Sequence, residues 1–258
     1  MGIIEAIKKG FGVATKSLGL VLILFTFNAI WSIASLPLVA RQGTAVTPQV
    51  TATALTFSLL FILVSIFVQG GSLALIRDYI KEGKMKLANL LSNGLKYYLR
   101  LFGLGLLIIL IVTVAALLAA LLVVATAPLN NTTVTIIAAT IALVIGGIGL
   151  YYMLLLTMSP YSLVCDEVGI IESMKRSVKL VRKNVGKVLL LLVILILISL
   201  GIGFLIGLVI GLLTAAVPGG AGQVLISIVN SAFNGYLGVV MMASFMVFYL
   251  ALAAKEKA

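Results

Sequence analysis

The amino-acid sequence predicts an all-α membrane protein whose six transmembrane helices form three parallel repeats, each an amphipathic helix followed by a transmembrane hairpin. Three observations predict this fold class: the composition, six long apolar stretches and an internal repeat. Of 258 residues, 62% are hydrophobic and 10% are charged, against about 45–50% and about 25% in a typical soluble domain. Such an apolar excess needs a bilayer as solvent, and we expect residues 1–258 to form a single integral membrane domain.

The same composition excludes several kinds of chemistry. Histidine is absent and Cys165 is the one cysteine. An intrachain disulfide, a Cys/His metal site and Ser-His-Asp or Cys-His catalysis are therefore excluded. We expect no cofactor, no metal and no enzymatic activity. The net charge is +11, but in a membrane protein the placement of the charges matters more than their sum, and we expect no nucleic-acid partner.

Six apolar stretches reach the length of about 20 residues that a spanning helix needs. They cover residues 18–40, 51–75, 101–126, 134–157, 186–216 and 223–253. Apart from Lys187 at the edge of the fifth stretch, they contain no Asp, Glu, Lys or Arg. Ionisable residues inside the membrane are typical of proton relays, so their absence argues against a proton-coupled pump.

The basic residues lie on alternate connections. Three precede the first stretch, six lie between the second and third, five lie between the fourth and fifth with Lys187 at the start of the fifth, and two end the chain; Arg41 alone lies on the other side. By the positive-inside rule, this distribution of 17 of the 18 basic residues places both termini in the cytoplasm. We therefore expect a multi-pass protein of the cell membrane.

The chain contains an internal repeat. The segment that starts at Gly2 matches the segment that starts at Gly169, with nine identities in 21 positions at an offset of 167, and a weaker copy lies at an offset near 83. These offsets predict repeats over approximately 2–85, 86–168 and 169–253. Prolines near the outer ends of the first, third and fifth stretches mark the hairpin tips; they are Pro37, Pro128 and Pro218.

Each repeat is expected to open with an amphipathic helix, because apolar residues recur at helical spacing. The three stripes are Ile4, Ile7, Phe11, Ala14 and Leu18; Ala88, Leu91, Leu95, Tyr98 and Phe102; and Ile171, Met174, Val178, Val181 and Val185.

The third amphipathic helix carries a strongly basic face. Its members are Lys175, Arg176, Lys179, Arg182 and Lys183. One interpretation is binding of lipid headgroups or of a protein partner. The alternative is topology control combined with packing under the helical bundle. Asp166 and Glu167 precede this helix; we expect them to cap its N-terminus rather than to act as an acid–base pair.

Two further groups of residues lie within the spans. The amides Asn28, Gln69, Asn230 and Asn234 either line a polar path or form interhelical hydrogen bonds. Gly203, Gly207 and Gly211 form a small-residue ridge on one helix face, which allows close packing by another helix of the chain or by a second subunit.

The stretch from Ser159 through Glu167, followed by the run from Gly169 to Ser177, combines a proline after the fourth span, an acidic pair and a basic helix with small residues. This pattern resembles the membrane-domain family of glycerophosphodiester phosphodiesterases, in particular its stand-alone six-helix relatives. In fused members of that family the catalytic residues belong to a separate soluble barrel, which has no counterpart in this sequence. The resemblance therefore implies a fold and no activity.

The sequence favours a non-enzymatic scaffold or accessory protein that interacts with membrane lipids through its basic cytoplasmic helices, with a protein partner or a second copy as a further expectation. The alternative is a transporter or permease subunit for a lipid or a small apolar solute.

Overall fold

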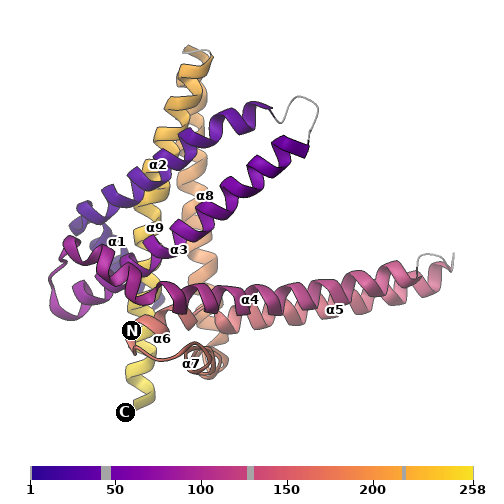
Figure 1. Cartoon of the computed structure of the whole chain (residues 1–258). Helices are drawn as coiled ribbons and strands as arrows, with labels where there is room; N and C mark the ends of the chain where they lie inside the picture. The colour runs from indigo at the N-terminus through magenta and orange to yellow at the C-terminus, as the bar shows by residue number, and fades with distance from the viewer. Residues whose placement is uncertain (1, 42–47, 127–130, 217–218, 258) are drawn as a thin grey trace. The chain divides into compact units, whose positions relative to one another are not determined.

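The regular elements in the described part of the chain are all helical (Figure 1). The computed structural model describes residues 2–41, 48–126, 131–216 and 219–257, and no strand occurs within these ranges. The helices are α1 (Ile3–Lys16), α2 (Leu18–Arg41), α3 (Pro48–Glu82), the short 3-10 helix η1 (Leu87–Asn89), α4 (Leu90–Thr126), α5 (Thr132–Leu156), α6 (Ser159–Cys165), α7 (Ile170–Arg182), α8 (Val185–Ala216) and α9 (Gly220–Lys257).

Six of these helices, α2, α3, α4, α5, α8 and α9, are long and apolar enough to cross a membrane. The six predicted spans are thereby confirmed as helices of sufficient length and hydropathy. Pro37 lies inside α2, which continues to Arg41. The predicted hairpin-tip residues Pro128 and Pro218 lie outside the described residues.

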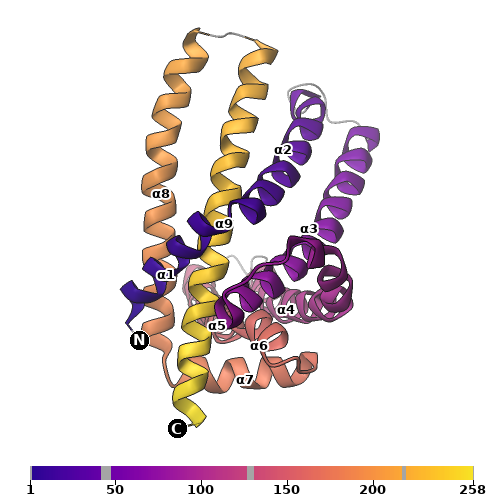
Figure 2. The same cartoon turned by 90° about the vertical axis from the view of Figure 1, so that its left-hand side faces the viewer.

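The chain divides into two compact units, of which the first comprises Met1–Tyr98 and Leu190–Ala258. Within it, α1, α2 and α3 all pack against α9 (Figure 2). A glycine permits the closest approach of α2 and α9, because a Cβ atom at Gly235 would lie only 2.7 Å from the backbone nitrogen of Phe25. The aromatic side chains of Trp31, Phe57 and Phe61 then join α2 to α3, with ring centroids 4.8 and 5.4 Å from that of Trp31.

The second unit comprises Leu99–Leu189. In it α4 and α5 run side by side (Figure 1). A Cβ atom at Gly149 would lie 3.2 Å from the Cβ of Ala115. The short helix α6 is buried at six of its seven residues, including Cys165, and α7 packs against both α5 and α6. Ser177 joins α7 to α5: its hydroxyl donates to the Leu155 carbonyl at 2.6 Å and accepts from the Met158 amide at 3.1 Å.

The buried faces of the amphipathic segments overlap the predicted apolar stripes only in part. The stripe residues Ile7 and Ala14 of α1 and Val181 of α7 are buried as expected. The other buried residues lie beside the stripes: Ala6, Gly10 and Val13 in α1; Leu90, Gly94 and Tyr97 in α4; Ser173, Ser177 and Leu180 in α7. Several predicted stripe residues are exposed instead, among them Leu91 at 64% and Leu95 at 71%. Small residues such as Gly10, Gly94 and Ser177 allow close helix approach, so they share the contact with larger buried residues, while stripe residues such as Leu91 and Leu95 lie outside it.

The second repeat also differs from the predicted pattern. Its expected amphipathic helix is the first part of α4, which runs without a break from Leu90 to Thr126 after η1. By contrast, α1 ends before Ser17 and α7 ends before Lys183, so that α2 and α8 start as separate helices.

Candidate functional site

The basic helix α7 begins directly after Gly169, which has an extended backbone and provides no side-chain cap. The prediction that Asp166 and Glu167 cap this helix is therefore wrong. Asp166 instead ends α6, where it accepts a hydrogen bond from the Ser162 hydroxyl at 3.4 Å. Glu167 occupies the left-handed backbone region with φ 55°, in the connection to α7.

Arg176 is held by two carboxylates. Its guanidinium pairs with Asp166 at 3.1 Å and with Glu172, one helical turn earlier. The hydrogen bond that Arg176 donates to Glu172, supported by the one that it donates to Asp166, raises the pKa of Arg176 above its usual value. Arg176 thus attaches α7 to the end of α6, which is a structural role that its membership of a basic face did not predict.

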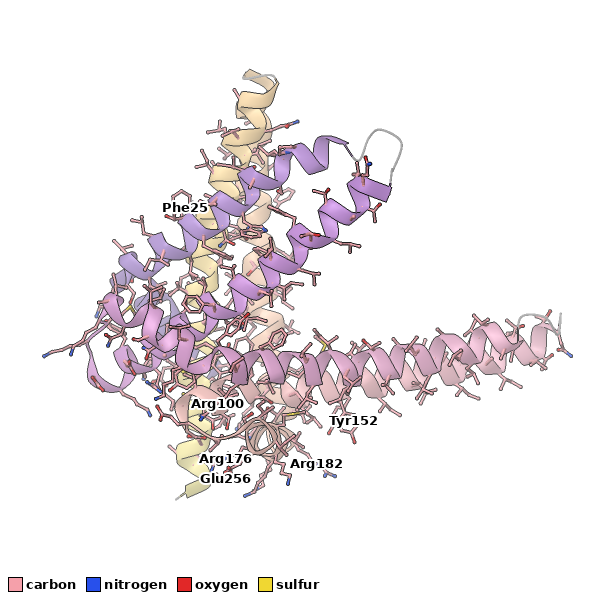
Figure 3. All side chains as sticks on the ribbon, viewed as in Figure 1. Phe25, Arg100, Tyr152, Arg176, Arg182 and Glu256 are labelled. Atoms are coloured by element: carbon pink, nitrogen blue, oxygen red, sulfur yellow. The ribbon has the colours of Figure 1, made fainter. Side chains whose placement is uncertain are left out.

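The other four predicted basic residues line a groove of about 590 Å³, called here the α7 groove. Its cations are Lys175, Lys179, Arg182 and Lys183. Its apolar lining residues are Ile111, Tyr152, Leu156, Ile171, Met174 and Val178. Figure 3 shows Arg182 on α7 and Tyr152 on α5. The residues that the structure describes place no carboxylate in this lining.

The groove combines two kinds of surface. The stripe residues Ile171, Met174 and Val178 form one apolar wall, and Tyr152 and Leu156 of α5 form another. Cations at the rim attract an anion, and the apolar walls exclude water, which strengthens that attraction. The residues from α4 and α5 were missed by sequence reasoning, because nothing in the pattern of an apolar span separates a groove-lining residue from one that faces lipid.

Three of the four predicted polar-path residues come together in the first unit. Asn28 of α2 and Asn230 and Asn234 of α9 line a pocket of about 190 Å³. The remaining lining residues are Trp31, Ser32, Ser35, Phe61 and Ser231. Gln69 is exposed and is not part of this lining. The Asn28 amide donates to the Leu24 carbonyl at 2.8 Å, a bond within its own helix rather than between helices.

The glycine ridge of α8 makes little contact within the chain. A Cβ atom at Gly203 would lie 3.7 Å from the ring of Phe233, an ordinary van der Waals distance. At Gly207 and Gly211, a Cβ atom would meet no heavy atom of the described residues within 4 Å. The described residues of the chain therefore do not supply a closely packed helix along the whole ridge.

Among the described residues, no group of three or more His, Cys, Asp or Glu side chains could hold a metal ion. The part of the chain that the structure describes is thus helical, without strands, and six of its helices are long and apolar enough to cross a membrane. A family model described as "Domain of unknown function (DUF7847)" matches residues 1–252, and the chain belongs to this family. No curated protein and no solved structure matches it.

Proposed function

We propose that this protein is a non-enzymatic, multi-pass protein of the cell membrane that binds an anionic lipid in the α7 groove and acts as a scaffold or accessory protein. The observation that carries the proposal is the combination of four cations with an apolar lining that contains no carboxylate among the described residues. The cations suit a phosphate-containing headgroup, and the apolar walls suit the start of an acyl chain.

The dimensions and charges of the groove agree with this occupant. A volume of about 590 Å³ lies within the usual range of about 300–1,000 Å³ for small-molecule sites. Each basic residue near an anionic membrane surface contributes about 1 kcal/mol. Two of the four cations should therefore account for about 2 kcal/mol of binding free energy, or roughly 30-fold in affinity.

The proposal includes the cytoplasmic orientation of α7 and of both termini, and the threefold repeat. The positive-inside distribution supports the orientation. The helix starts support the repeat, since Ile3 of α1 and Ile170 of α7 lie 167 residues apart, as do Leu18 of α2 and Val185 of α8. The resemblance of residues 159–177 to the membrane domains of glycerophosphodiester phosphodiesterases remains a hypothesis about ancestry; it transfers no catalytic residue.

Removal of two groove cations tests lipid binding. In neutral detergent, the double variant Lys179→Gln/Arg182→Gln should bind fluorescent phosphatidylglycerol roughly 30-fold more weakly than the unmodified protein. Binding of phosphatidylcholine should change little.

The matched control removes the same charge elsewhere. Lys84 and Lys86 lie exposed between α3 and η1 and outside the α7 groove, so Lys84→Gln/Lys86→Gln should retain full affinity. Equal affinities of the groove variant and the unmodified protein, with matching circular dichroism spectra, would contradict the proposal.

The second candidate function is that of a permease. The observation that favours it is the convergence of Asn28, Asn230 and Asn234 on one pocket of about 190 Å³. Because amides and hydroxyls line this pocket, an uncharged polar solute fits it better than the apolar solute expected from the sequence.

Proteoliposomes test this candidate. Glycerol should enter vesicles that contain the protein faster than protein-free vesicles, as measured by the light scattering of swelling. The nearly isosteric variant Asn230→Leu/Asn234→Leu should abolish the increase. Equal swelling of vesicles with and without the protein would reject the permease.

A further inference from the structure

The first unit contains a groove that is similar in construction to the α7 groove. It lies against α1 and has a volume of about 820 Å³; it is called here the α1 groove. Lys8, Lys9 and Lys16 supply its cations, and its apolar wall includes Ile80 of α3 and Leu250 of α9. Glu5 is the carboxylate in its lining.

The two grooves use equivalent positions of the repeat. The offset of 167 relates Lys8 to Lys175 and Lys16 to Lys183, and all four of these lysines line their respective grooves. Gly12 and Lys179 form a third equivalent pair, again with both members in a lining. Two basic positions, about two helical turns apart, are thus repeated together with the groove beside them; Lys183 directly follows the last residue of α7.

The same ion pair also recurs in each helix. Lys9 pairs with Glu5 at 3.1 Å, and Arg176 pairs with Glu172. The hydrogen bond from Lys9 lowers the pKa of the Glu5 carboxyl, so Glu5 is ionised at neutral pH. Since Glu5 and Lys9 largely neutralise each other, Lys8 and Lys16 remain as the cations that can attract an anion to the α1 groove.

Each helix is fixed to its neighbour at an equivalent small residue. Ser177 bonds α7 to the end of α5. Its equivalent Gly10 brings α1 against α9, where a Cβ atom would contact the Ser244 hydroxyl and lie 2.8 Å from the Val240 carbonyl oxygen. The two helices therefore present the equivalent lysines in the same register beside the second helix of a hairpin.

In the middle repeat, the basic residues at the corresponding positions contact other groups of the protein. An offset of 84 relates Gly12 to Lys96 and Lys16 to Arg100. The Lys96 ammonium lies 5.2 Å from the centre of the Tyr97 ring, within cation–π range, and Arg100 donates to the Glu167 carbonyl at 3.4 Å.

We propose that the α1 groove is a second site for an anionic lipid, so that the protein binds one such lipid at each of two equivalent helices. This inference rests on the proposed function of the α7 groove. Glu5 partly offsets the lysines that line the α1 groove, whereas the charged residues in the described lining of the α7 groove are four cations and no carboxylate. The α1 site should consequently be the weaker of the two.

The test counts bound lipids by native mass spectrometry of the full chain in a mixture of phosphatidylglycerol and phosphatidylcholine. The unmodified protein should retain two phosphatidylglycerol molecules selectively. Lys8→Gln/Lys16→Gln should retain one, because each lost lysine weakens the α1 site about fivefold. The control Lys84→Gln/Lys86→Gln should retain two.

A second variant blocks the groove without changing its charge. A Cβ atom at Gly12 would meet no heavy atom of the described residues within 4 Å, so Gly12→Phe can extend into the groove and should also leave one lipid bound.

The outcomes separate the two proposals. If both α1-groove variants retain two lipids while Lys179→Gln/Arg182→Gln retains one, the α1 site is overturned and the α7 site stands. If the α7-groove variant alone retains two, the α7 proposal fails and the α1 site stands. Two retained lipids in all three variants would overturn both.

Discussion

Gly10, Gly94 and Ser177 occupy equivalent positions at which three helical segments meet their neighbours. Gly10 contacts Val240 and Ser244 of α9, and a Cβ atom at Gly94 would lie 2.8 Å from the ring of Phe67 in α3. An analysis of hydropathy periodicity identifies large apolar residues and does not identify glycine or serine as contact residues. The sequence therefore predicted only part of the face that makes the contact, namely Ile7 and Ala14 of α1 and Val181 of α7.

Substitution at Gly10 should weaken the attachment of α1 to α9. In Gly10→Ala the added methyl group would clash with Ser244 and the Val240 carbonyl oxygen, and we expect a loss of about 1–3 kcal/mol in the free energy of unfolding. Thermal unfolding in detergent measures this change.

Gly12→Ala is the matched control on the same helix. Its methyl group would meet no described atom within 4 Å, and alanine favours the helix by up to about 1 kcal/mol relative to glycine. Equal or greater stability of Gly10→Ala compared with Gly12→Ala would contradict the contact.

At the scale of elements, the six long helices could be predicted, whereas their junctions could only partly be predicted. Ser17, Leu101 and Asn184 are equivalent by offsets of 84 and 83. Ser17 ends α1 with φ −114° and ψ 45°, and the Asn184 amide bonds back to the Leu180 carbonyl between α7 and α8. The asparagine side chain competes with helical hydrogen bonds, whereas leucine favours the helix, in agreement with the unbroken course of α4. The buried Ser17 hydroxyl has no hydrogen-bond partner among the described residues.

The N-terminus of α5 has a clear sequence signal. The Asn131 side chain accepts hydrogen bonds from the backbone amides of Thr133 and Val134 at 3.0 and 3.3 Å. An asparagine followed by threonines is typical of such a cap.

The attachment of α7 to α5 should depend on one hydroxyl. Ser177→Ala removes both bonds that the buried Ser177 makes with Leu155 and Met158, and unpaired buried polar groups cost about 1–3 kcal/mol. The free energy of unfolding should fall by that amount.

Ser173 is the natural control, because it is buried on the same helix but bonds only within it, to the Ile170 carbonyl. Ser173→Ala should therefore cost less than Ser177→Ala. The reverse order would show that Ser177 does not hold the two helices together.

At the scale of the whole molecule, composition and basic-residue placement predicted the class of protein, but the grooves could not be predicted. Their walls combine residues distant in sequence, such as Val13, Ile80 and Leu250 in the α1 groove. In the sequence, nothing distinguishes each of these residues from the other apolar residues of its own helix. In the sequence, only the basic residues of the α7 groove could be recognised as a candidate site. That group also included Arg176, which the structure shows paired with Asp166 at the end of α6 and with Glu172 of α7.

The proposed orientation can be tested in intact cells. Lys84 and Thr132 are exposed at opposite ends of the predicted spans. A membrane-impermeant maleimide should label Thr132→Cys from outside and should label Lys84→Cys only after lysis, since the positive-inside rule places Lys84 in the cytoplasm. The opposite labelling pattern would reverse the topology.

Cys165 lies in α6 with 6% of its surface exposed, and the sequence contains no other cysteine. The natural chain is thus close to a cysteine-free background for spectroscopy, because a buried thiol reacts slowly with polar reagents. A fluorophore or spin label can be attached at one chosen thiol without first redesigning the protein. Reporters placed singly beside the α1 groove and the α7 groove would then follow the occupancy of each groove separately.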